Sequence, residues 1–567
     1  MNTCIARPSR NHSGARNLFR FGVRSRLGPE NVFTLPNPRT LKRNQFRAPK
    51  SLLRSSLCAL CVLLWQSALA DVHYVDLNST NATPPYSSWS TAATNIQDAV
   101  DAAVAGDEIV VTNGTYATGG RATFDGTLIR VAVDKPLSVR SVNGPQFTII
   151  DGGGSNRCAY VTDGATLSNF TLTNGYVFYY GGGGVLCAPN AVVSNCVITG
   201  NRHDLYQESP FGSGGAYGGT LNNCTLTGNS TVAADFSFFG HASAYGGGAY
   251  ASTLNNCTLT ANSAKATVGQ AATAKAFGGG AAYCALNNCV FSGNRAFGQS
   301  FLGSVSALDS YGGGTYECTL KNCKLTNNSA IYGGGAYGCA LNNCTLTGHR
   351  GTGAYSSALS NCIVYFNGEN YQSCTLNYSC TTPQPTNGVG NITNAPLFVD
   401  QASGNLRLQS NSPCINAGNN SYVTNATDLD GNPRIAGGTV DIGAYEFQSP
   451  ASMISYAWLQ HFNLPINPLT DAADPDGDGV NNYHEWLARS DPTNPLSSPA
   501  QLTIIASGTD VILMWSTNAV GFTLQSTTNL VSPSVWTSNS PAPFVIGWQN
   551  VVTNSLSGPQ QFYRLSQ

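Results

Sequence analysis

Apolar residues recur at a short, regular spacing through the middle of this chain. Cys257 and Leu259 stand two residues apart, so both side chains face one side of a strand. Leu254 stands three residues before Cys257, which breaks the alternation and predicts a bend at Asn255–Asn256. An Asn-Cys pair followed by an apolar residue occurs seven times, at Asn195-Cys196, Asn223-Cys224, Asn256-Cys257, Asn288-Cys289, Asn322-Cys323, Asn343-Cys344 and Asn361-Cys362. A repeat of roughly 20 to 35 residues predicts a solenoid, whose units bury their apolar faces against one another.

Two bends and a glycine run divide each unit into three short sides. Asn tolerates the left-handed backbone region that the first bend requires. The second bend is expected at Asn262, in a slot that also holds Asn201, Asn229, Asn294, Asn328 and Asn367, with His349 as an exception. Gly-Gly-Gly runs at 181–183, 246–248, 278–280, 312–314 and 333–335 suit a tight bend. The pattern predicts an all-β, right-handed parallel β-helix in which stacked Cys and Asn residues build the fold.

The length of the units varies in an informative way. Successive cysteines of the repeat are 28, 33, 32, 34, 21 and 18 residues apart. The first four units therefore carry insertions, at about 202–213, 230–244, 263–276 and 295–310, which we expect to emerge as loops along one edge. Their aromatic residues and one histidine predict a ligand-binding patch: Tyr206, Phe211, Phe236, Phe238, Phe239, His241, Phe297 and Phe301. The alternative is that the insertions extend the sheet and bury these rings.

The first 70 residues differ from the rest in composition. They contain 12 Lys and Arg residues and one acid, Glu30, followed by an apolar run at 57–65 and the small-residue sequence Ala68-Leu69-Ala70. This pattern predicts a secretory signal cleaved before Asp71, and the run is too short for a comfortable membrane span. We expect a bacterial protein that is secreted or displayed on the cell surface, with no transmembrane span in the mature chain.

The net charge of the mature chain limits its possible binding partners, and its cysteine count bears on whether disulfides form. The mature chain carries 16 basic and 28 acidic residues, a net charge of −12, which disfavours nucleic acid and anionic polysaccharides as partners. It retains 15 cysteines, an odd number, and parallel side chains one strand spacing apart suit disulfides poorly. We expect mostly reduced, buried thiols.

The start of the mature chain and the repeats together resemble a known superfamily. Residues 95–106 predict a short amphipathic helix with Ile96, Ala99, Val100 and Ala103 on one face, and 107–116 predicts a buried strand and turn. A helix across the first coil would cover an open sheet edge. These features resemble the pectate-lyase-like right-handed β-helix superfamily. The alternation of Gly-Gly-Ala-Tyr with Leu-Thr-Gly-Asn also resembles the repeats of polymorphic outer-membrane autotransporters.

Residues 394–447 carry a more specific resemblance. The segments 394–400, 412–418, 428–434 and 440–446, which read NAPLFVD, SPCINAG, DLDGNPR and VDIGAYE, resemble the choice-of-anchor Q domain. That resemblance implies export and a C-terminal cap on the β-helix, without an assigned catalytic residue. Asp428, Asp430 and Asp441 are compatible with a metal site, although turn roles are the simpler reading.

A cation-binding motif follows at 474–485. Oxygen ligands stand at loop positions 1, 3, 5, 7, 9 and 12, supplied by Asp474, Asp476, Asp478, the Val480 carbonyl, Asn482 and Glu485, with Gly479 at position 6. This spacing predicts a structural Ca²⁺ site of EF-hand type. Pro475, Asn481 and the following Asp491-Pro-Thr-Asn-Pro make the segment resemble thrombospondin type 3 or dockerin-like repeats. The alternative is an acidic linker without bound metal.

The remaining residues complete five predicted domains. Short strand patterns at 502–565 predict a small β-sandwich, with Trp515, Trp536 and Trp548 either in its core or on a sugar-binding face. The domains are a leader and signal peptide at 1–70, the β-helix at 71–393, its choice-of-anchor Q-like end at 394–447, a helix and calcium loop at 450–498, and the sandwich at 500–567.

Two hypotheses for function follow. The first is a non-catalytic, secreted or surface-attached adhesion or glycan-binding protein that contacts a polysaccharide or another cell-surface component through the aromatic patch. The second is a polysaccharide lyase or glycoside hydrolase on the same scaffold, for which His203, Asp204, Asp235 and His241 are the candidate site residues. The few acids between 158 and 380 share no slot of the repeat, which favours the first.

Overall fold

The computed structural model describes residues 70–567 apart from 123–126, 179–180, 207–211, 238, 270–271, 302–306, 498–501, 518–521, 531–534, 539–540, 548, 556–559 and 567. The leader predicted over 1–70 therefore lies outside the described residues except for Ala70. Within those described ranges, no helix is both long enough and apolar enough to cross a membrane.

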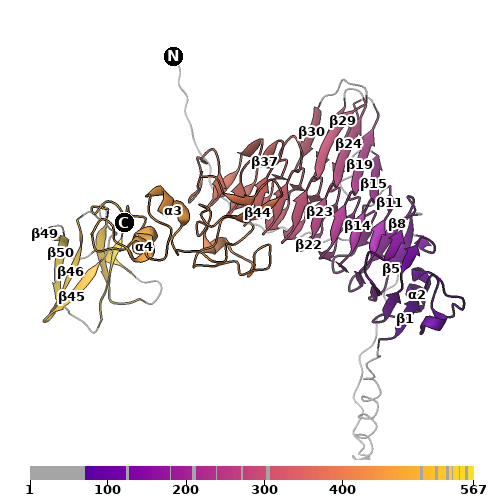
Figure 1. Ribbon diagram of the computed structural model, residues 1–567, viewed down its shortest axis with the longest axis horizontal. Coiled ribbons are helices and arrows are strands. Elements are labelled where there is room, and N and C mark those ends of the chain that lie inside the picture. The colour runs from indigo at the N-terminus through magenta and orange to yellow at the C-terminus, as the bar shows by residue number, and fades with distance from the viewer. Residues whose placement is uncertain are drawn as a thin grey trace, which may run out of the picture. The chain divides into compact units, whose positions relative to one another are not determined.

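Each turn of the chain adds one short strand to each of three sheets, which confirms the parallel β-helix (Figure 1). Sheet A contains, in spatial order, β1 (Val72–Val75), β2 (Glu108–Val111), β6 (Ser138–Ser141), β9 (Thr166–Ser168), β13 (Val192–Ser194), β17 (Thr220–Asn222), β22 (Thr253–Asn255), β27 (Ala285–Asn287), β32 (Thr319–Lys321), β35 (Ala340–Asn342), β38 (Ala358–Ser360) and β41 (Thr375–Asn377). Sheet B contains β3 (Gly114–Tyr116), β7 (Thr148–Asp151), β10 (Thr171–Thr173), β14 (Val197–Thr199), β18 (Thr225–Thr227), β23 (Thr258–Thr260), β28 (Val290–Ser292), β33 (Lys324–Thr326), β36 (Thr345–Thr347), β39 (Ile363–Val364) and β42 (Cys380–Thr381).

Sheet C closes the third side of each turn. It contains β4 (Arg121–Ala122), β5 (Leu128–Val133), β8 (Arg157–Val161), β12 (Val185–Cys187), β16 (Ala216–Tyr217), β21 (Ala249–Tyr250), β26 (Ala281–Ala282), β31 (Thr315–Tyr316), β34 (Ala336–Tyr337), β37 (Thr352–Tyr355) and β40 (Glu369–Gln372). Only the first pair, β4 and β5, is antiparallel in this sheet. Leucines stack in register inside the coils, as in Leu221, Leu254 and Leu286, and form one continuous buried core with the cysteines.

The cysteines stand in files, as predicted, and all 15 that are described are free thiols. Their sulfur atoms do more than fill space. The backbone N–H of Cys224 donates to Sγ of Cys257, at 3.4 Å, and that of Cys344 donates to Sγ of Cys362, at 3.4 Å. These two sulfur atoms therefore satisfy N–H groups that the bend leaves without a strand partner.

The asparagines occupy both predicted bends, in different roles. At the first bend the backbone is left-handed, with φ near 53° at Asn223 and 54° at Asn256. At the second bend the left-handed residue is the preceding one, such as Gly228 or Ala261, and the asparagine itself is buried. There Asn229 Nδ2 donates to Asn262 Oδ1, at 3.0 Å, and the backbone N–H of Asn229 donates to the same oxygen. These amide ladders satisfy polar groups inside the solenoid.

Glycine runs form the remaining bends of the coils, and a helix covers the first coils. Gly246 has φ +56°, and a Cβ on Gly247 would lie 2.4 Å from the Gly279 carbonyl oxygen, so the run needs both glycines. Helix α2 (Ile96–Ala102) covers the first coils and is capped by Asn95, whose side chain accepts from the Asp98 N–H. Oε1 of buried Gln97 accepts from the Ala132 N–H of β5, at 2.7 Å, which confirms the predicted cover of the sheet.

The insertions form two further parallel sheets, which we call the fin. Sheet D contains β11 (Tyr176–Val177), β15 (Arg202–Tyr206), β19 (Ser230–Asp235), β24 (Ser263–Val268) and β29 (Arg295–Ser300); sheet E contains β20 (His241–Tyr245), β25 (Thr273–Phe277) and β30 (Ala307–Tyr311). The two sheets pack face to face through small side chains, including Ala233, Ala244, Ala266 and Ala274. The expectation of loops was wrong, because each arm of an insertion pairs with the equivalent arm of the next coil (Figure 1).

Residues 394–461 pack beside the last coils. A small antiparallel pair, β43 (Phe398–Asp400) and β44 (Asn405–Leu408), shares a second core with Ile363, Cys380 and helix α3 (Tyr456–His461). The N–H of Ala444 donates to Thr345 Oγ1, at 3.0 Å, and Asn361 Nδ2 donates to the Asn419 carbonyl, at 2.9 Å. This segment therefore covers the outer face of the last strands of sheet B.

Helix α4 (Asn482–Ala488) and two antiparallel sheets follow. One sheet contains β45 (Thr503–Ser507), β46 (Asp510–Ser516), β50 (Gln549–Ser555) and β49 (Phe544–Ile546), and the other contains β48 (Thr537–Ser538), β47 (Thr523–Thr527) and β51 (Phe562–Ser566). Trp515 is buried in their shared core. The side chain of Arg564 lies over the Trp536 ring, 4.3 Å from its centroid, and Trp548 lies outside the described residues. Short 3-10 turns lie at Trp89–Thr91, Asn420–Tyr422 and Thr470–Ala472.

Candidate functional site

The outer end of the fin is a rigid turn built around Asp235. This carboxylate is only 4% exposed and closes the turn between β19 and β20 by three hydrogen bonds. Its Oδ1 accepts from the N–H and the hydroxyl of Ser237, at 2.9 and 2.7 Å, and its Oδ2 accepts from the His241 N–H, at 3.0 Å. A Cβ on Gly240 would overlap this carboxylate at 2.5 Å. Hydrogen bonds lower the pKa of Asp235 against the opposing effect of burial.

Several aromatic rings project from this turn and its surroundings into solvent. Phe236 is 58% exposed, Phe239 66% and Phe301 74%. Phe239 adopts a left-handed backbone with φ 66°, which is uncommon for a bulky residue, and the Phe236 and Phe301 rings meet edge to face at 6.3 Å. The structure therefore brings Phe236 and Phe301 into contact and places Phe239 on the same turn as Phe236, and we call these three exposed residues the fin tip.

The other predicted patch residues are distributed differently. Tyr206, which is 56% exposed, and half-buried Phe297 lie on the outer face of sheet D, and His241 is exposed at the start of sheet E. The guanidinium of Arg295 lies 4.3 Å from the centre of the Phe297 ring. Phe211 and Phe238 lie outside the described residues. The alternative that added sheets would bury the rings was thus right about the sheets and wrong about Tyr206, Phe236, Phe239 and Phe301.

The four residues named for catalysis do not form one site. On β15 and β19, buried His203 pairs with Thr231 and Asp204 pairs with Val232, so alternation places His203 and Asp204 on opposite faces of sheet D. Asp235 shares the inner face with Thr231 and is occupied by the turn, whereas Asp204 is paired with Arg202 at 2.6 Å. His241 belongs to the other sheet. Asp204 and Asp235 therefore cannot act as a facing acid–base pair.

The sequence pattern did not reveal a double file of rings beside the glycine runs. One file runs along sheet C and the other along the base of sheet E; together they contain Tyr217, Tyr250, Tyr283, Tyr316, Tyr337, Tyr355, Tyr245, Phe277, Tyr311 and Tyr332. Tyr245 and Phe277 stack at 4.5 Å with planes 10° apart. Because stacked rings cover one another's faces, these files brace the coils and offer little ring face to a ligand. A Tyr or Phe flanking each Gly-Gly-Gly run was the available signal.

The predicted calcium loop gathers its carboxylates. Oxygen atoms of Asp474, Asp476 and Asp478 all lie within 4.8 Å of one another. Both oxygens of Asp474 accept backbone N–H groups, from Gly477 and Gly479, at 2.9 Å, which folds the loop around this side chain. One oxygen each of Asp476 and Asp478 accepts a backbone N–H two residues later.

The remaining oxygens of the loop are buried without hydrogen-bond partners. They are Oδ2 of Asp476, Oδ2 of Asp478, Oδ1 of Asn482 and Oε2 of Glu485. Glu485 is fully buried at the first turn of α4, and burial, with the charges of the three aspartates, raises its pKa to about 7. Four buried acceptors in one loop, with no donor among the described groups, fit a hard cation such as Ca²⁺.

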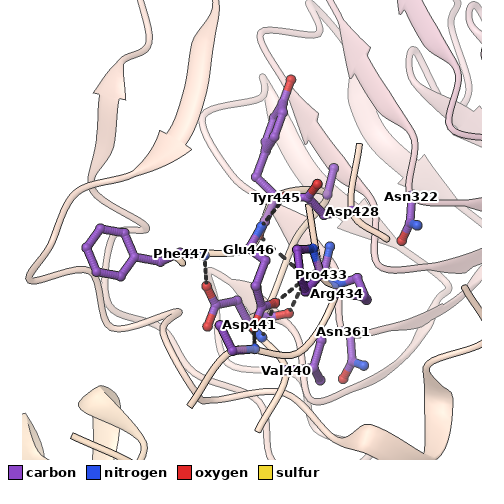
Figure 2. Close-up of polar contacts among 12 residues, drawn as sticks. Asn322, Asn361, Asp428, Pro433, Arg434, Val440, Asp441, Tyr445, Glu446 and Phe447 are labelled. Atoms are coloured by element: carbon purple, nitrogen blue, oxygen red, sulfur yellow. Dashed lines mark hydrogen bonds and ion pairs between the residues drawn. The ribbon is translucent and has the colours of Figure 1, made fainter. Parts of the chain in front are cut away.

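A buried acidic cluster lies in the segment that covers sheet B (Figure 2). Nη2 of Arg434 meets Oε2 of Glu446 at 3.1 Å, with both side chains almost fully buried. Burial raises the pKa of Asp441 to about 7 and, with the charge of Asp441, that of Glu446 to about 8. Asp428 accepts backbone N–H groups of Asp430, Asn432 and Glu446, so these acids organise turns, and Asp430 pairs with Arg407 at 2.6 Å.

Comparisons with known proteins give limited similarity. No protein-family model and no curated protein matches the sequence. Among solved structures, pectate lyase Pel9A is 16% identical, with 66% of this chain and 96% of that chain covered and a TM-score of 0.37. A rhamnogalacturonan lyase is 12% identical, with 60% of this chain and 95% of that chain covered and a TM-score of 0.32. The Dettilon tailspike protein is also 12% identical, with 60% of this chain and 71% of that chain covered and a TM-score of 0.27. The parallel β-helix is established by the strand pairing of the chain itself, and no activity is carried over from these proteins.

Proposed function

We propose that this chain is an exported bacterial β-helix protein that binds a neutral polysaccharide of a cell surface through the fin tip, without cleaving it. The observation that carries this proposal is the group of exposed rings of Phe236, Phe239 and Phe301 on a turn fixed by buried Asp235. Exposed aromatic side chains on a rigid scaffold are typical of binding surfaces. The hydrogen bonds from Ser237 and His241 to Asp235 hold these parts of the turn in place, which lowers the conformational entropy lost on binding.

The ligand class follows from charge and ring chemistry. The mature chain is acidic, so polyanions are repelled, and nucleic acid is an unsuitable partner. Aromatic ring faces suit the apolar C–H faces of sugar rings, and Tyr206 and His241 near the tip add polar groups for hydroxyls. A neutral glycan therefore matches this surface better than a charged one.

The test is binding of the chain from Asp71 onward to a panel of neutral and anionic polysaccharides. We expect retention on a neutral polysaccharide that falls at least tenfold in the triple variant Phe236→Ser, Phe239→Ser, Phe301→Ser, because each exposed ring contributes on the order of 1 kcal/mol to a contact. Exposed Phe147, far along the chain, provides the control Phe147→Ser. Equal retention of the triple variant and the control would contradict the proposal.

The same incubation tests the enzymatic alternative. Release of new reducing ends or unsaturated sugars by the mature chain would show a lyase or hydrolase and overturn the non-catalytic part of the proposal. The separation of His203, Asp204, Asp235 and His241 supports the expectation that no product forms.

We infer that 394–447 is the choice-of-anchor Q-like end of the β-helix and that 474–485 holds one structural Ca²⁺. The packing of the first segment on sheet B supports its role as a cover for the last coils. The unpartnered oxygens of Asp476, Asp478, Asn482 and Glu485 support the second, and the position of Glu485 on α4 resembles a thrombospondin type 3 or dockerin-like loop.

Calcium titration tests the metal proposal. Calorimetry on the mature chain is expected to show one Ca²⁺ bound, and a concentration a hundredfold above Kd to add about 2.7 kcal/mol of stability. Glu485→Gln is expected to abolish both effects and still fold, since a neutral amide suits this buried position. Asp491→Asn, just beyond the loop, is the control. Binding that is absent, or unchanged in Glu485→Gln, would exclude the site.

A further inference from the structure

A groove of about 570 Å³ runs between the coils and the segment that covers sheet B. Its floor is the outer surface of two neighbouring coils, including Asn256, Thr258 and Asn288, and its wall is the turn at 427–431 with the ring of Tyr445. Tyr445 points away from the buried Arg434 cluster (Figure 2). The groove therefore joins a solenoid face with a separate chain segment.

The floor presents a row of ordered amides. Asn256 Nδ2 donates to Asn223 Oδ1 and Asn288 Nδ2 donates to Asn256 Oδ1, each at 3.2 Å. The ladder uses one N–H and one acceptor lobe of Asn256, which has a second of each. Asn288 Oδ1 accepts from both Asn322 Nδ2, at 3.2 Å, and Asn425 Nδ2, at 3.5 Å, so Asn288 offers a second N–H alone. The row ends at Asn322, whose Nδ2 donates to the Thr427 carbonyl at 2.7 Å and so ties wall to floor.

The wall adds a balanced set of charges. Arg407 holds Asp430 through two bonds of 2.6 Å, and its guanidinium lies 5.1 Å from the centre of the Tyr445 ring. Lys324, one coil beyond the floor residue Val290, donates to the Gly404 carbonyl at 3.4 Å, and burial together with the charge of Arg407 lowers its pKa. Arg407 and Lys324 lie outside the lining of the groove and offset the charges of its two acids, Asp428 and Asp430.

We propose that this groove binds a segment of a neutral oligosaccharide lying along the amide row. Sugar hydroxyls supply a donor and an acceptor at every repeat, which matches amides repeated at the strand spacing of about 4.8 Å. An extended peptide would need an open sheet edge, whereas the floor is a side-chain surface of strands already paired on both sides. The inference shares only its ligand class with the proposed function and concerns a different place on the molecule.

Matched variants on neighbouring coils test the inference. The probes are cellohexaose, xylohexaose and mannohexaose, titrated calorimetrically into the chain from Asp71 onward. Thr258→Val and Asn256→Gly remove groove groups, and Gly accepts the left-handed backbone of Asn256, which has φ 54°. Thr225→Val and Asn195→Gly change the same slots one and two coils away, outside both the groove and the amide row, and Asn195 has the same left-handed backbone, with φ 53°.

We expect at least one probe to bind the wild-type chain, with affinity reduced about fivefold to tenfold by each groove variant and unchanged in each control. Three results would overturn the inference: no binding of any probe, equal losses in groove and control variants, or binding lost only in the fin-tip triple variant. The last result would leave the proposed function standing, whereas a loss confined to the groove variants would support the groove and leave the fin tip to the polysaccharide-retention test of its own triple variant.

Discussion

At the scale of single residues, one histidine in the buried file of stacked amides makes the hydrogen bonds that an asparagine makes in neighbouring coils. His349 occupies a slot that Asn holds in neighbouring coils, and the Asn328 N–H donates to its Nδ1 at 3.0 Å, where an amide oxygen would otherwise accept. The His349 N–H donates to Asn367 Oδ1, at 3.1 Å, so the ladder continues through the histidine. Burial lowers the pKa of His349 to about 4.

This substitution predicts a pH effect. Between pH 6.5 and about 4 the unfolded chain protonates this imidazole and the folded chain does not, so stability falls as pH falls through that window. Between pH 7 and pH 4 the free energy of unfolding is expected to fall by about 3 kcal/mol less in His349→Asn than in the wild type. Denaturant unfolding at both pH values measures this difference. The control is exposed His461→Asn. Equal pH dependence in wild type and His349→Asn would contradict this account.

At the scale of elements, the fin depends on small side chains between its two sheets. Ala266 is fully buried on β24, whereas Ala234 stands on the outer face of β19. Alternating alanines let two sheets approach closely, and a larger inner side chain has no space to occupy. The fin therefore behaves as a packed element and differs from a set of independent loops.

The fin should accordingly respond to overpacking on one face only. Ala266→Leu is expected to lower the free energy of unfolding by about 1–3 kcal/mol, and Ala234→Leu to leave it nearly unchanged. Thermal unfolding, with hydrogen exchange at 263–268 as a local readout, measures both. A similar loss in the two variants, or none in Ala266→Leu, would show that the sheets do not pack as described.

At the scale of the whole molecule, the repeating coils were the part that the sequence predicted best. The Asn-Cys spacing predicted the three sides of each coil and the left-handed bends at Asn223 and Asn256, because stacking forces equivalent residues into equivalent environments. The clustering of Asp474, Asp476 and Asp478 was predicted equally well, because these carboxylates are close together in the chain, and bound Ca²⁺ stays a prediction. The sheets of the fin were foreseen only as the alternative to loops, because the partners of each insertion strand, such as Ser230 and Ser263, lie one whole unit apart in the chain and spacing alone does not show that they pair.

Sites formed by distant segments lay beyond sequence reasoning. The groove requires that 427–431 lie over Asn256 and Asn288, and that contact depends on how the last segment folds back along the coils. For the fin tip the sequence predicted that Phe236 and Phe301 share one edge, whereas the contact between their rings depends on how the strands of sheet D stack. Short sequence motifs do not indicate contacts between residues that are far apart in the chain.

The most direct measurement of the central claim is a hydrogen-exchange footprint of the mature chain with and without the neutral polysaccharide that it retains best. The account predicts slower exchange at 235–241 and 296–301, the turn and strand that carry Phe236, Phe239 and Phe301. Protection that spares the fin tip and falls only on other parts of the solenoid would contradict it.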